Sequence, residues 1–311
     1  MKPATKRVSS PVLVVGATGA LGRPVVQGLL ERGLTVRAAC RHIDRAADLA
    51  AQGAEVVAAD LTDAASLSRA CRGVERVLAA AHGMLGRGRW RSEQVDDTGH
   101  RALLAAAQAA GVRRFVYTSA FGAAPDHPID FFRTKHAIEQ ALAASGLDAV
   151  VLRPTAFMEH HAHNFNGKAL LEKGKVQFIG AGTKPRNFVC ARDVARFALR
   201  ALLEDPPPFR VLDIGGPGHH SNADVAALYA SAAGVPLRTS HLPVGLAAFL
   251  AKVARPLHPG MARVMALMSL PDAAISERFD GAAALVRDHG IPMTTLEAFV
   301  EGQVAEFRKQ A

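Results

Sequence analysis

The residues with the clearest chemical role are three glycines near the start of the chain, Gly16, Gly19 and Gly22. They follow a buried-strand run at Val12–Val15 and precede an amphipathic run at Val25–Leu30. At such a junction, backbone N–H groups approach a pyrophosphate at a helix N-terminus, where the helix dipole favours anions. A plain tight turn is the alternative. We predict a dinucleotide-binding turn made of Gly16, Thr18, Gly19, Ala20, Leu21 and Gly22.

The end of the second predicted strand indicates which dinucleotide is bound. A protein that selects NAD usually places Asp or Glu there, to bond the ribose 2′-hydroxyl. The segment Val36–His42 has no acidic residue, and Arg41 lies within reach of this corner. A guanidinium suits a 2′-phosphate. We therefore predict NADP(H) as the cofactor, with NAD(H) as the alternative; a solvated arginine is the simpler explanation of Arg41.

A third group of residues is apolar and aromatic, as expected of a pocket for a small apolar molecule. These residues lie on loops and helix starts that a parallel-sheet fold would turn toward the nicotinamide. The predicted pocket consists of Phe121, Phe131, Phe157, Met158 and His160. The neighbouring histidines lack metal-ligand spacing, so we predict no metal site. One of them, or His82, is a candidate polar contact or proton source for the substrate.

The elements that must position these residues alternate between strand and helix patterns. Strands are predicted at 11–15, 34–40, 54–58, 73–81, 113–119 and 147–152, and helices near 20–32, 44–52, 63–71, 94–110 and 131–145. Alternating elements require crossover connections, and these give a parallel sheet with helices on both faces. The predicted fold class is α/β, a Rossmann-type doubly wound parallel sheet.

After Pro154 this alternation ends. We predict a polar tail at 1–10, a dinucleotide-binding domain at 11–154, and a smaller α+β substrate lobe at 155–311 whose chain crosses back to the first domain. The lobe contains strands at Val176–Ile179, Asn187–Cys190 and near 210–214, and a helix at 191–204. Two helix starts are predicted from capping patterns, Ser221 with Asp224 and Thr294 with Glu297.

Composition narrows the class further. The net charge of +9 comes from arginines scattered along the 311 residues, without a basic stripe or an aromatic-interleaved patch, so we predict no nucleic-acid partner. The three cysteines, Cys40, Cys71 and Cys190, show no metal or disulfide spacing. The sequence shows no signal peptide and no run long enough to span a membrane. We expect a cytoplasmic protein with free thiols.

The segment 244–270 is unusually apolar. One interpretation is a helix pair that covers a substrate cleft or a subunit contact. The other is an interfacial helix that touches a membrane peripherally.

Four motifs occur in the order and spacing of one family: Gly16–Gly22, Asp60–Asp63, Ala110–Ser119 and Leu152–Thr155. Together they resemble the atypical or extended short-chain dehydrogenase/reductases, in the NmrA-like and NAD(P)H-quinone-reductase-like branch. The resemblance covers about residues 10–200. Beyond it, Asp213–Pro217 and Gly290–Glu297 look like the carboxyl-terminal lobes of extended members.

The resemblance implies further cofactor contacts. Asp60 and Leu61 would meet the adenine edge. Ala80, Ala81 and His82 would lie beside the nicotinamide ribose. Pro154 and Thr155 would lie near the carboxamide.

The resemblance also implies a catalytic serine at Ser119 and a lysine at Lys135, both of which would contact the cofactor. The family's tyrosine position, however, is Phe131, and neither Tyr117 nor Tyr229 is placed to replace it. Phenylalanine cannot donate a proton to a carbonyl oxygen. Three hypotheses remain: an NADPH-dependent reductase of a quinone, an enone or a similar acceptor, a non-catalytic NADP(H) sensor of NmrA type, and a nucleotide-binding accessory or assembly subunit.

Overall fold

The computed structural model describes residues 10–208, 210–270 and 278–310. These residues divide into two compact units. The first comprises Met1–Arg153 and Val194–Asp213, and the second comprises Pro154–Asp193 and Ile214–Ala311. Segment 194–213, within the predicted substrate lobe whose chain crosses back, belongs to the first unit. The predicted polar tail at 1–10 lies outside the described residues, apart from Ser10.

The first unit is built on a seven-stranded sheet in the order β10-β6-β5-β4-β1-β2-β3. Its strands are β1 (Val12–Val15), β2 (Val36–Cys40), β3 (Glu55–Ala58), β4 (Arg76–Ala79), β5 (Arg114–Thr118), β6 (Asp148–Pro154) and β10 (Val211–Ile214). Every pairing from β3 to β6 is parallel. The predicted Rossmann-type doubly wound sheet is therefore confirmed.

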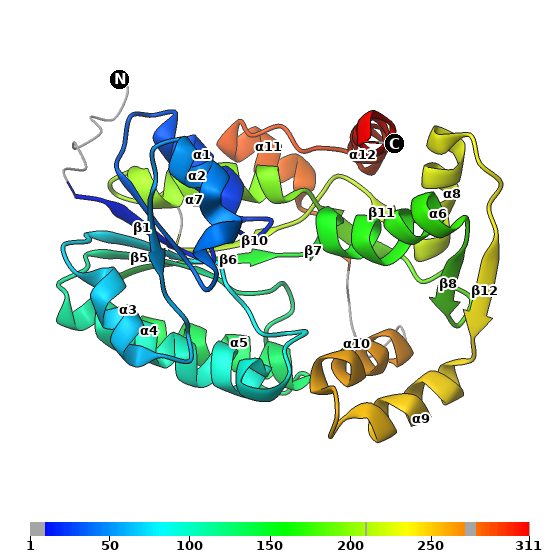
Figure 1. Cartoon of the computed structure of the whole chain (residues 1–311), viewed down its shortest axis with the longest axis horizontal. Coiled ribbons are helices and arrows are strands. Elements are labelled where there is room, and N and C mark those ends of the chain that lie inside the picture. Colours follow the sequence, from blue (N-terminus) through cyan, green and yellow to red (C-terminus); the bar gives the residue numbers. More distant parts are fainter. Residues whose placement is uncertain (1–9, 209, 271–277, 311) are drawn as a thin grey trace. The chain divides into compact units, whose positions relative to one another are not determined.

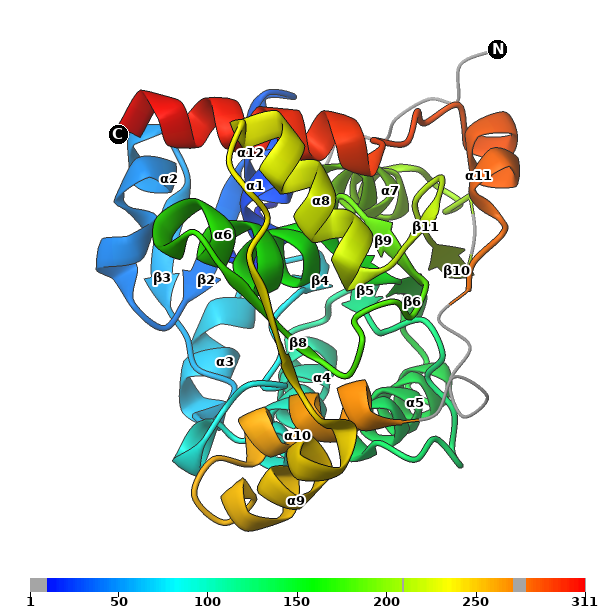
Figure 2. The ribbon, with the colours of Figure 1, turned by 90° about the vertical axis from the view of Figure 1, so that its right-hand side faces the viewer.

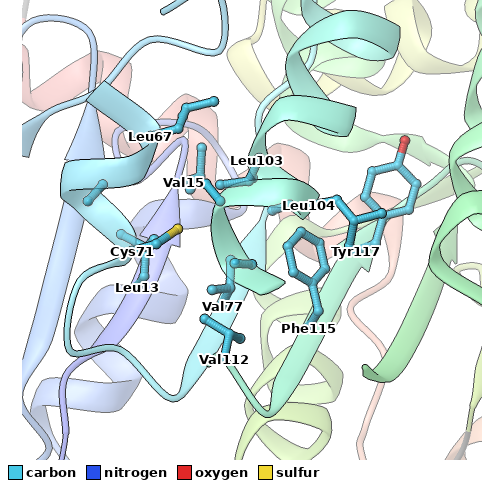
Figure 3. Packing of buried hydrophobic residues seen from close by; sticks show 14 of the residues in the cluster. Leu13, Val15, Leu67, Cys71, Val77, Leu103, Leu104, Val112, Phe115 and Tyr117 are labelled. Atoms are coloured by element: carbon cyan, nitrogen blue, oxygen red, sulfur yellow. The ribbon is translucent and has the colours of Figure 1, made fainter. Parts of the chain in front are cut away.

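Helices cover both faces of this sheet (Figure 1). On one side lie α1 (Gly22–Leu30), α2 (Ala47–Ala51) and α7 (Ala191–Leu203), and on the other α3 (Ala64–Cys71), α4 (His100–Ala109) and α5 (Asp130–Ala143). The core beneath the second group is almost entirely aliphatic. Figure 3 shows Leu103 and Leu104 packed beside Phe115 and Tyr117 of β5. The central strands β1, β4 and β5 are buried along their whole length, as is typical of a parallel sheet covered by helices on both faces.

The sheet order reverses between β1 and β4. In open α/β sheets, ligands bind outside the carboxyl ends of the strands at this switch point. The glycine turn follows β1, and Ala80 follows β4. The fold therefore places the predicted dinucleotide residues at the expected edge.

Three predicted elements differ in detail. The helix near 44–52 is a 3₁₀ turn (Ile43–Ala46) followed by α2. The helix near 94–110 begins as a π-helical stretch (Glu93–Gly99) before α4. The last helix starts at Leu296, and Thr295 rather than Thr294 caps it by accepting a hydrogen bond from the backbone N–H of Ala298 (3.2 Å). Thr294 is bound instead to Asp193, a partner 101 residues earlier that a local pattern does not reveal.

The second unit has two small sheets, β11-β9-β7 and β12-β8; Figure 1 shows β12 beside β8. Its strands are β7 (Ala156–Phe157), β8 (Val176–Ile179), β9 (Arg186–Val189), β11 (His219–His220) and β12 (Thr239–Leu242). Its helices are a π-helical stretch (Met158–Gly167), α6 (Lys168–Lys173), α8 (Asn222–Ala233), α9 (Val244–Ala254), α10 (Pro259–Ser269), α11 (Ala282–His289) and α12 (Leu296–Gln310). The predicted capping box of Ser221 and Asp224 opens α8. None of the helices in the described ranges has the length and apolar character to cross a bilayer.

Candidate functional site

The glycine turn after β1 is packed so tightly that a side chain is excluded at Gly16 and at Gly22. Gly16 has a φ of +86°, and a Cβ there would lie 2.8 Å from the backbone nitrogen of Ala81. A Cβ on Gly22 would collide with the carbonyl oxygen of Gly16. Gly19 is exposed, and its N–H donates to that same carbonyl (3.0 Å). The turn therefore presents bare backbone at the carboxyl end of β1.

The N-terminus of α1 is open toward this turn. Its cap residue, Leu21, makes no side-chain capping bond, and its first turn has no acidic residue. The nearby cation Arg23 is engaged by Asp48 and by the carbonyl of Arg45. A helix end whose N–H groups lack side-chain partners is suited to bind phosphate. Thr18 and Ala20, both half-buried, complete the turn.

The corner at the ends of β2 and β3 contains an arginine–tryptophan–arginine stack that we did not predict. The guanidinium carbons of Arg41 and Arg89 lie 5.6 and 5.3 Å from the centroid of the Trp90 ring. Both are cation–π distances. The local run Arg87–Arg91 interleaves arginines with the chain's single tryptophan, so the expectation that no such patch exists was wrong. That run was the available sequence signal.

The carboxylate of Asp60 contacts several residues at this corner. It accepts a hydrogen bond from the Trp90 indole (3.0 Å) and another from the backbone N–H of Thr62 (2.8 Å). Arg89 lies 3.5 Å from it. Burial alone would raise the pKa of Asp60, but the bonds from Trp90 and Thr62 outweigh burial, so the pKa is lowered. Asp60 is therefore an anion that fixes the indole, and Leu61 beside it is buried.

The residues after β4 form the next part of the edge. Ala80 and Ala81 are half-buried, and Ala81 abuts Gly16. His82 is exposed, and its ring lies edge-on to Phe131 at 6.2 Å. The predicted cofactor residues between Gly16 and His82 thus lie at or just after the carboxyl ends of β1 to β4.

Ser119 is bound in a way the sequence did not indicate. Its hydroxyl donates to the buried carboxylate of Glu139, on the second turn after Phe131. Glu139 also accepts from Arg153, whose Nε lies 2.9 Å from Oε1. The hydroxyl proton of Ser119 is thus committed to a carboxylate, and the oxygen lone pairs are what it offers to a ligand.

Lys135 is buried, with 2% of its side chain exposed. Its ammonium donates to the carbonyl of Thr118 (3.0 Å) and lies 4.0 Å from the fully buried carboxylate of Asp96. It also lies 5.4 Å from the centroid of the Phe131 ring. Burial lowers the pKa of Lys135, although Asp96 and Glu139 act in the opposite direction. Its predicted contact with the nicotinamide ribose stays a prediction.

Asp96 was missed because its role depends on tertiary partners. It accepts from the N–H of Gly83 (3.1 Å) and from the Ser92 hydroxyl (2.6 Å). The signal that was available is the periodicity of α5, whose buried face contains Phe131, Lys135 and Glu139 at intervals of four. Two charges on a buried helix face require partners.

Tyr117 does not replace the absent phenol of α5. It is fully buried, and among the described residues its hydroxyl has no hydrogen-bond partner. Burial raises its pKa well above the usual value. Its ring lies edge-on to His100 at 5.3 Å, and burial lowers the pKa of His100 to about 4.

The remaining predicted residues divide between the units. Phe121, in the first unit, is half-buried after β5. In the second unit, Pro154 is buried and the N–H of Thr155 donates to Ile214 (2.9 Å). The pocket residues there are Phe157, Met158 and His160, of which Met158 is buried. The roles of these residues stay predictions.

The histidines near Met158 make ordinary contacts. His160 lies 3.2 Å from the Asn164 amide, and His163 lies 3.0 Å from the Tyr229 hydroxyl. Burial lowers the pKa of both histidines, which favours their neutral form. Over residues 10–208, 210–270 and 278–310, no cluster of three or more His, Cys, Asp or Glu side chains could hold a metal ion.

Comparison with known proteins gives a consistent picture. The profile of the NAD(P)H-binding family matches residues 16–205. The chain is 32% identical over 227 residues to the NAD(P)H azoreductase of Xenophilus azovorans, which spans 73% of this chain and 75% of that protein. It is 30% identical over 289 residues to quinone oxidoreductase 2 of Escherichia coli, 92% and 96% of the two chains. It is also 29% identical over 244 residues to a photosystem II assembly factor of Synechocystis, 78% and 74% of the two chains.

One solved structure is similar over nearly the whole chain. It is the NADPH-dependent quinone oxidoreductase of Escherichia coli in complex with NADPH, with a TM-score of 0.72 and 28% identity. The similarity covers 94% of this chain and 99% of that one. The fold described above therefore occurs in a chain that is similar over nearly its whole length.

Proposed function

Because this chain belongs to the NAD(P)H-binding family, we propose that it is an NADPH-dependent reductase that delivers hydride to a small apolar acceptor, and that quinones are the favoured acceptor class. The support from comparison is the similarity to quinone oxidoreductase 2 over 92% of the chain and to an azoreductase over 73%. Both names denote reduction of conjugated, largely apolar molecules.

The residues of the first unit fit a bound dinucleotide. The backbone of Gly19 is exposed at the turn, and the N-terminus of α1, which lacks a side-chain cap, would offer N–H groups to a pyrophosphate. Arg41 would hold the 2′-phosphate, and Asp60 would lie at the adenine edge. NADPH, when bound, supplies the hydride. Ser119, Lys135, Pro154 and Thr155 are proposed to lie around its nicotinamide half.

The observation that carries the proposal is the absence of a phenol from the buried face of α5, where Phe131 stands beside Lys135. Phe131 stands one turn before Lys135, and the Ser119 hydroxyl donates to Glu139. An alcohol product needs a proton delivered to an alkoxide, for which a phenol is suited. A reduced quinone instead leaves a phenolate oxygen, whose conjugate acid has a pKa of about 10. This anion is a much weaker base than an alkoxide, so it forms without a positioned acid and takes its proton from the solvent afterwards.

Side chains of this protein would then set the shape of the acceptor site and exclude water from it. Phe131 excludes water beside Lys135, and the buried ammonium keeps positive charge near the forming oxyanion. The apolar residues Phe121, Phe157 and Met158 are proposed to contact the acceptor, and His160 or His82 to provide a polar contact.

The direct test is NADPH oxidation against a panel of quinones, azo dyes, enones and aldehydes. The expected result is turnover of quinones and none of simple aldehydes. Tight NADPH binding without turnover of any acceptor would overturn the reductase proposal.

Phe131→Tyr is the matched variant for the mechanism. It places a hydroxyl four residues before Lys135 on the same helix face. We expect it to gain carbonyl reduction, since a positioned acid contributes about 10²–10⁴-fold. Quinone turnover should persist. If the variant folds, binds NADPH and gains nothing, a dormant acid–base centre is ruled out.

A second candidate function is a non-catalytic NADP(H)-binding protein, either a sensor of NmrA type or an assembly subunit. The specific support is the 29% identity to a photosystem II assembly factor over 78% of the chain, together with the missing phenol. This hypothesis expects nucleotide binding that changes capture of a partner protein, with no acceptor reduced in the panel.

A further inference from the structure

Helix α9 exposes its large apolar side chains and buries its small ones. Ala247 and Ala251 are buried, whereas Leu246, Phe249 and Val253 are 46%, 61% and 55% exposed. An ordinary surface helix has the reverse arrangement, with its large apolar residues against the core. The exposed residues recur at helical spacing and so share one side of the helix.

Exposed apolar residues also follow the end of α9 in the chain. Leu257, in the connection to α10, is 81% exposed, and Met261 at the start of α10 is also exposed. Helix α10 packs against α9 (Figure 2), so the two form a helix hairpin within the second unit. Segment 244–270 therefore contains two packed helices. We name the surface made by Leu246, Phe249, Val253, Leu257 and Met261 the α9 face.

The charged residues of the α9–α10 hairpin have one sign. Lys252 and Arg255 are exposed on the same helix end, and no Asp or Glu stands anywhere between Asp224 and Asp272 in the sequence. Apolar side chains flanked by Lys or Arg on a helix without acidic residues are typical of helices that lie in a membrane interface. Single exposed apolar residues are normal, but a contiguous group indicates a binding surface.

We propose that the α9 face docks on an anionic lipid surface, with the apolar residues at the level of the acyl-chain boundary and Lys252 and Arg255 against lipid phosphates. This proposal is independent of the reductase proposal. Charge decides between a lipid surface and a second copy of the chain. In a two-fold dimer the same patch faces itself, so Lys252 and Arg255 would meet like charges without an acidic partner from 225–271. Anionic phosphates supply the missing complement.

The test is co-sedimentation of the full-length protein with phosphatidylcholine vesicles that contain or lack phosphatidylglycerol. We expect binding to the anionic vesicles, weakened by salt, and little binding to neutral ones. Leu246→Ser with Phe249→Ser should lower the partition coefficient at least about ten-fold, because apolar burial is lost. Lys252→Glu with Arg255→Glu should do the same.

Val286→Ser is the matched control, since Val286 is an exposed apolar residue on α11, away from the α9 face in sequence. It should bind vesicles like the parent. Because all these positions are exposed, thermal unfolding should change little. The proposal is overturned if the parent does not bind anionic vesicles at low salt. The proposal is also overturned if sedimentation velocity shows that the parent is a dimer and that Leu246→Ser with Phe249→Ser abolishes the dimer.

Discussion

At the carboxyl edge of the sheet, Arg41 and Asp60 contact partners that hold them in place in their charged forms. Arg41 keeps an exposed guanidinium against Trp90, and Trp90 is fixed by the Asp60 carboxylate. The pKa of Asp60 is lowered, so this arrangement persists at neutral pH. Arg41 is therefore a fixed cation that is available to a ligand.

Arg41→Ala tests the choice of cofactor. Loss of a charge-assisted bond to a 2′-phosphate costs about 1.5–3 kcal/mol. NADPH affinity should therefore fall about ten-fold or more, with NADH affinity nearly unchanged. Calorimetric titration of both nucleotides measures this. Arg45→Ala removes an equally exposed arginine nearby and should change neither affinity. Equal losses for NADPH and NADH would place the effect of Arg41 elsewhere.

His100 makes stability depend on pH. Burial lowers its pKa to about 4 from an unfolded value of 6.5, so the folded protein holds it neutral. As the pH falls below 6.5, only the unfolded chain takes the proton, and the free energy of unfolding decreases. The loss over the range from 6.5 to 4 is about 3 kcal/mol, at 1.36 kcal/mol per pKa unit.

Urea unfolding between pH 7.5 and 4.5 measures this loss. His100→Gln removes the titrating group, so its stability should fall less steeply over the same range. Identical slopes for parent and variant would show that other groups, not His100, cause the acid sensitivity.

Helices and strands set which residues meet, and the sequence predicted the elements better than the contacts. The runs of apolar residues at Val12–Val15 and Phe115–Tyr117 determined their strands, because such runs are typical of strands buried on both faces. The glycine turn was predictable from a local pattern. Glu139, however, meets Ser119 across 20 residues, and Trp90 meets Asp60 across 30. Neither separation matches the repeat of a helix or a strand, so no local pattern reveals these two contacts. Only the folded sheet brings the paired residues together.

Substitutions at two glycines of the turn after β1 should have different effects, one on NADPH binding and the other on the stability of the fold. In Gly19→Val the new Cβ lies 3.2 Å from its nearest neighbour and projects from exposed backbone, so the fold should survive. The side chain would occupy the pyrophosphate position, and calorimetry should detect no NADPH binding. In Gly22→Val the Cβ meets backbone of Gly16 and Ala17, which should cost about 1–3 kcal/mol in stability. Micromolar NADPH binding by Gly19→Val would falsify the assigned site.

Over the molecule as a whole, reactive groups are kept inside each unit. Cys40, Cys71 and Cys190 are free thiols and all are buried. Burial raises the pKa of Cys71 and of Cys190 to about 11 and raises that of Cys40 as well. As a result, the three cysteines are almost entirely in the thiol form at neutral pH, and burial is what protects them from reaction.

Native protein should therefore react slowly with Ellman's reagent at pH 8, and all three thiols should titrate at once in guanidinium chloride. Addition of NADPH should not speed the reaction. Rapid labelling of one thiol in the native state would show that burial does not protect that site, and mass spectrometry of the labelled peptide would identify it.

The arginine–tryptophan stack also gives the protein an optical reporter of its own. Trp90 is the chain's single tryptophan, so all indole emission originates beside Arg41 and Asp60. Reduced nicotinamide absorbs light in the range where indole emits. A nucleotide bound along this edge therefore quenches the emission by energy transfer, and the oxidised form, which lacks that absorption, does not. Binding and redox state of the nucleotide are thereby distinguishable by fluorescence in the unlabelled protein.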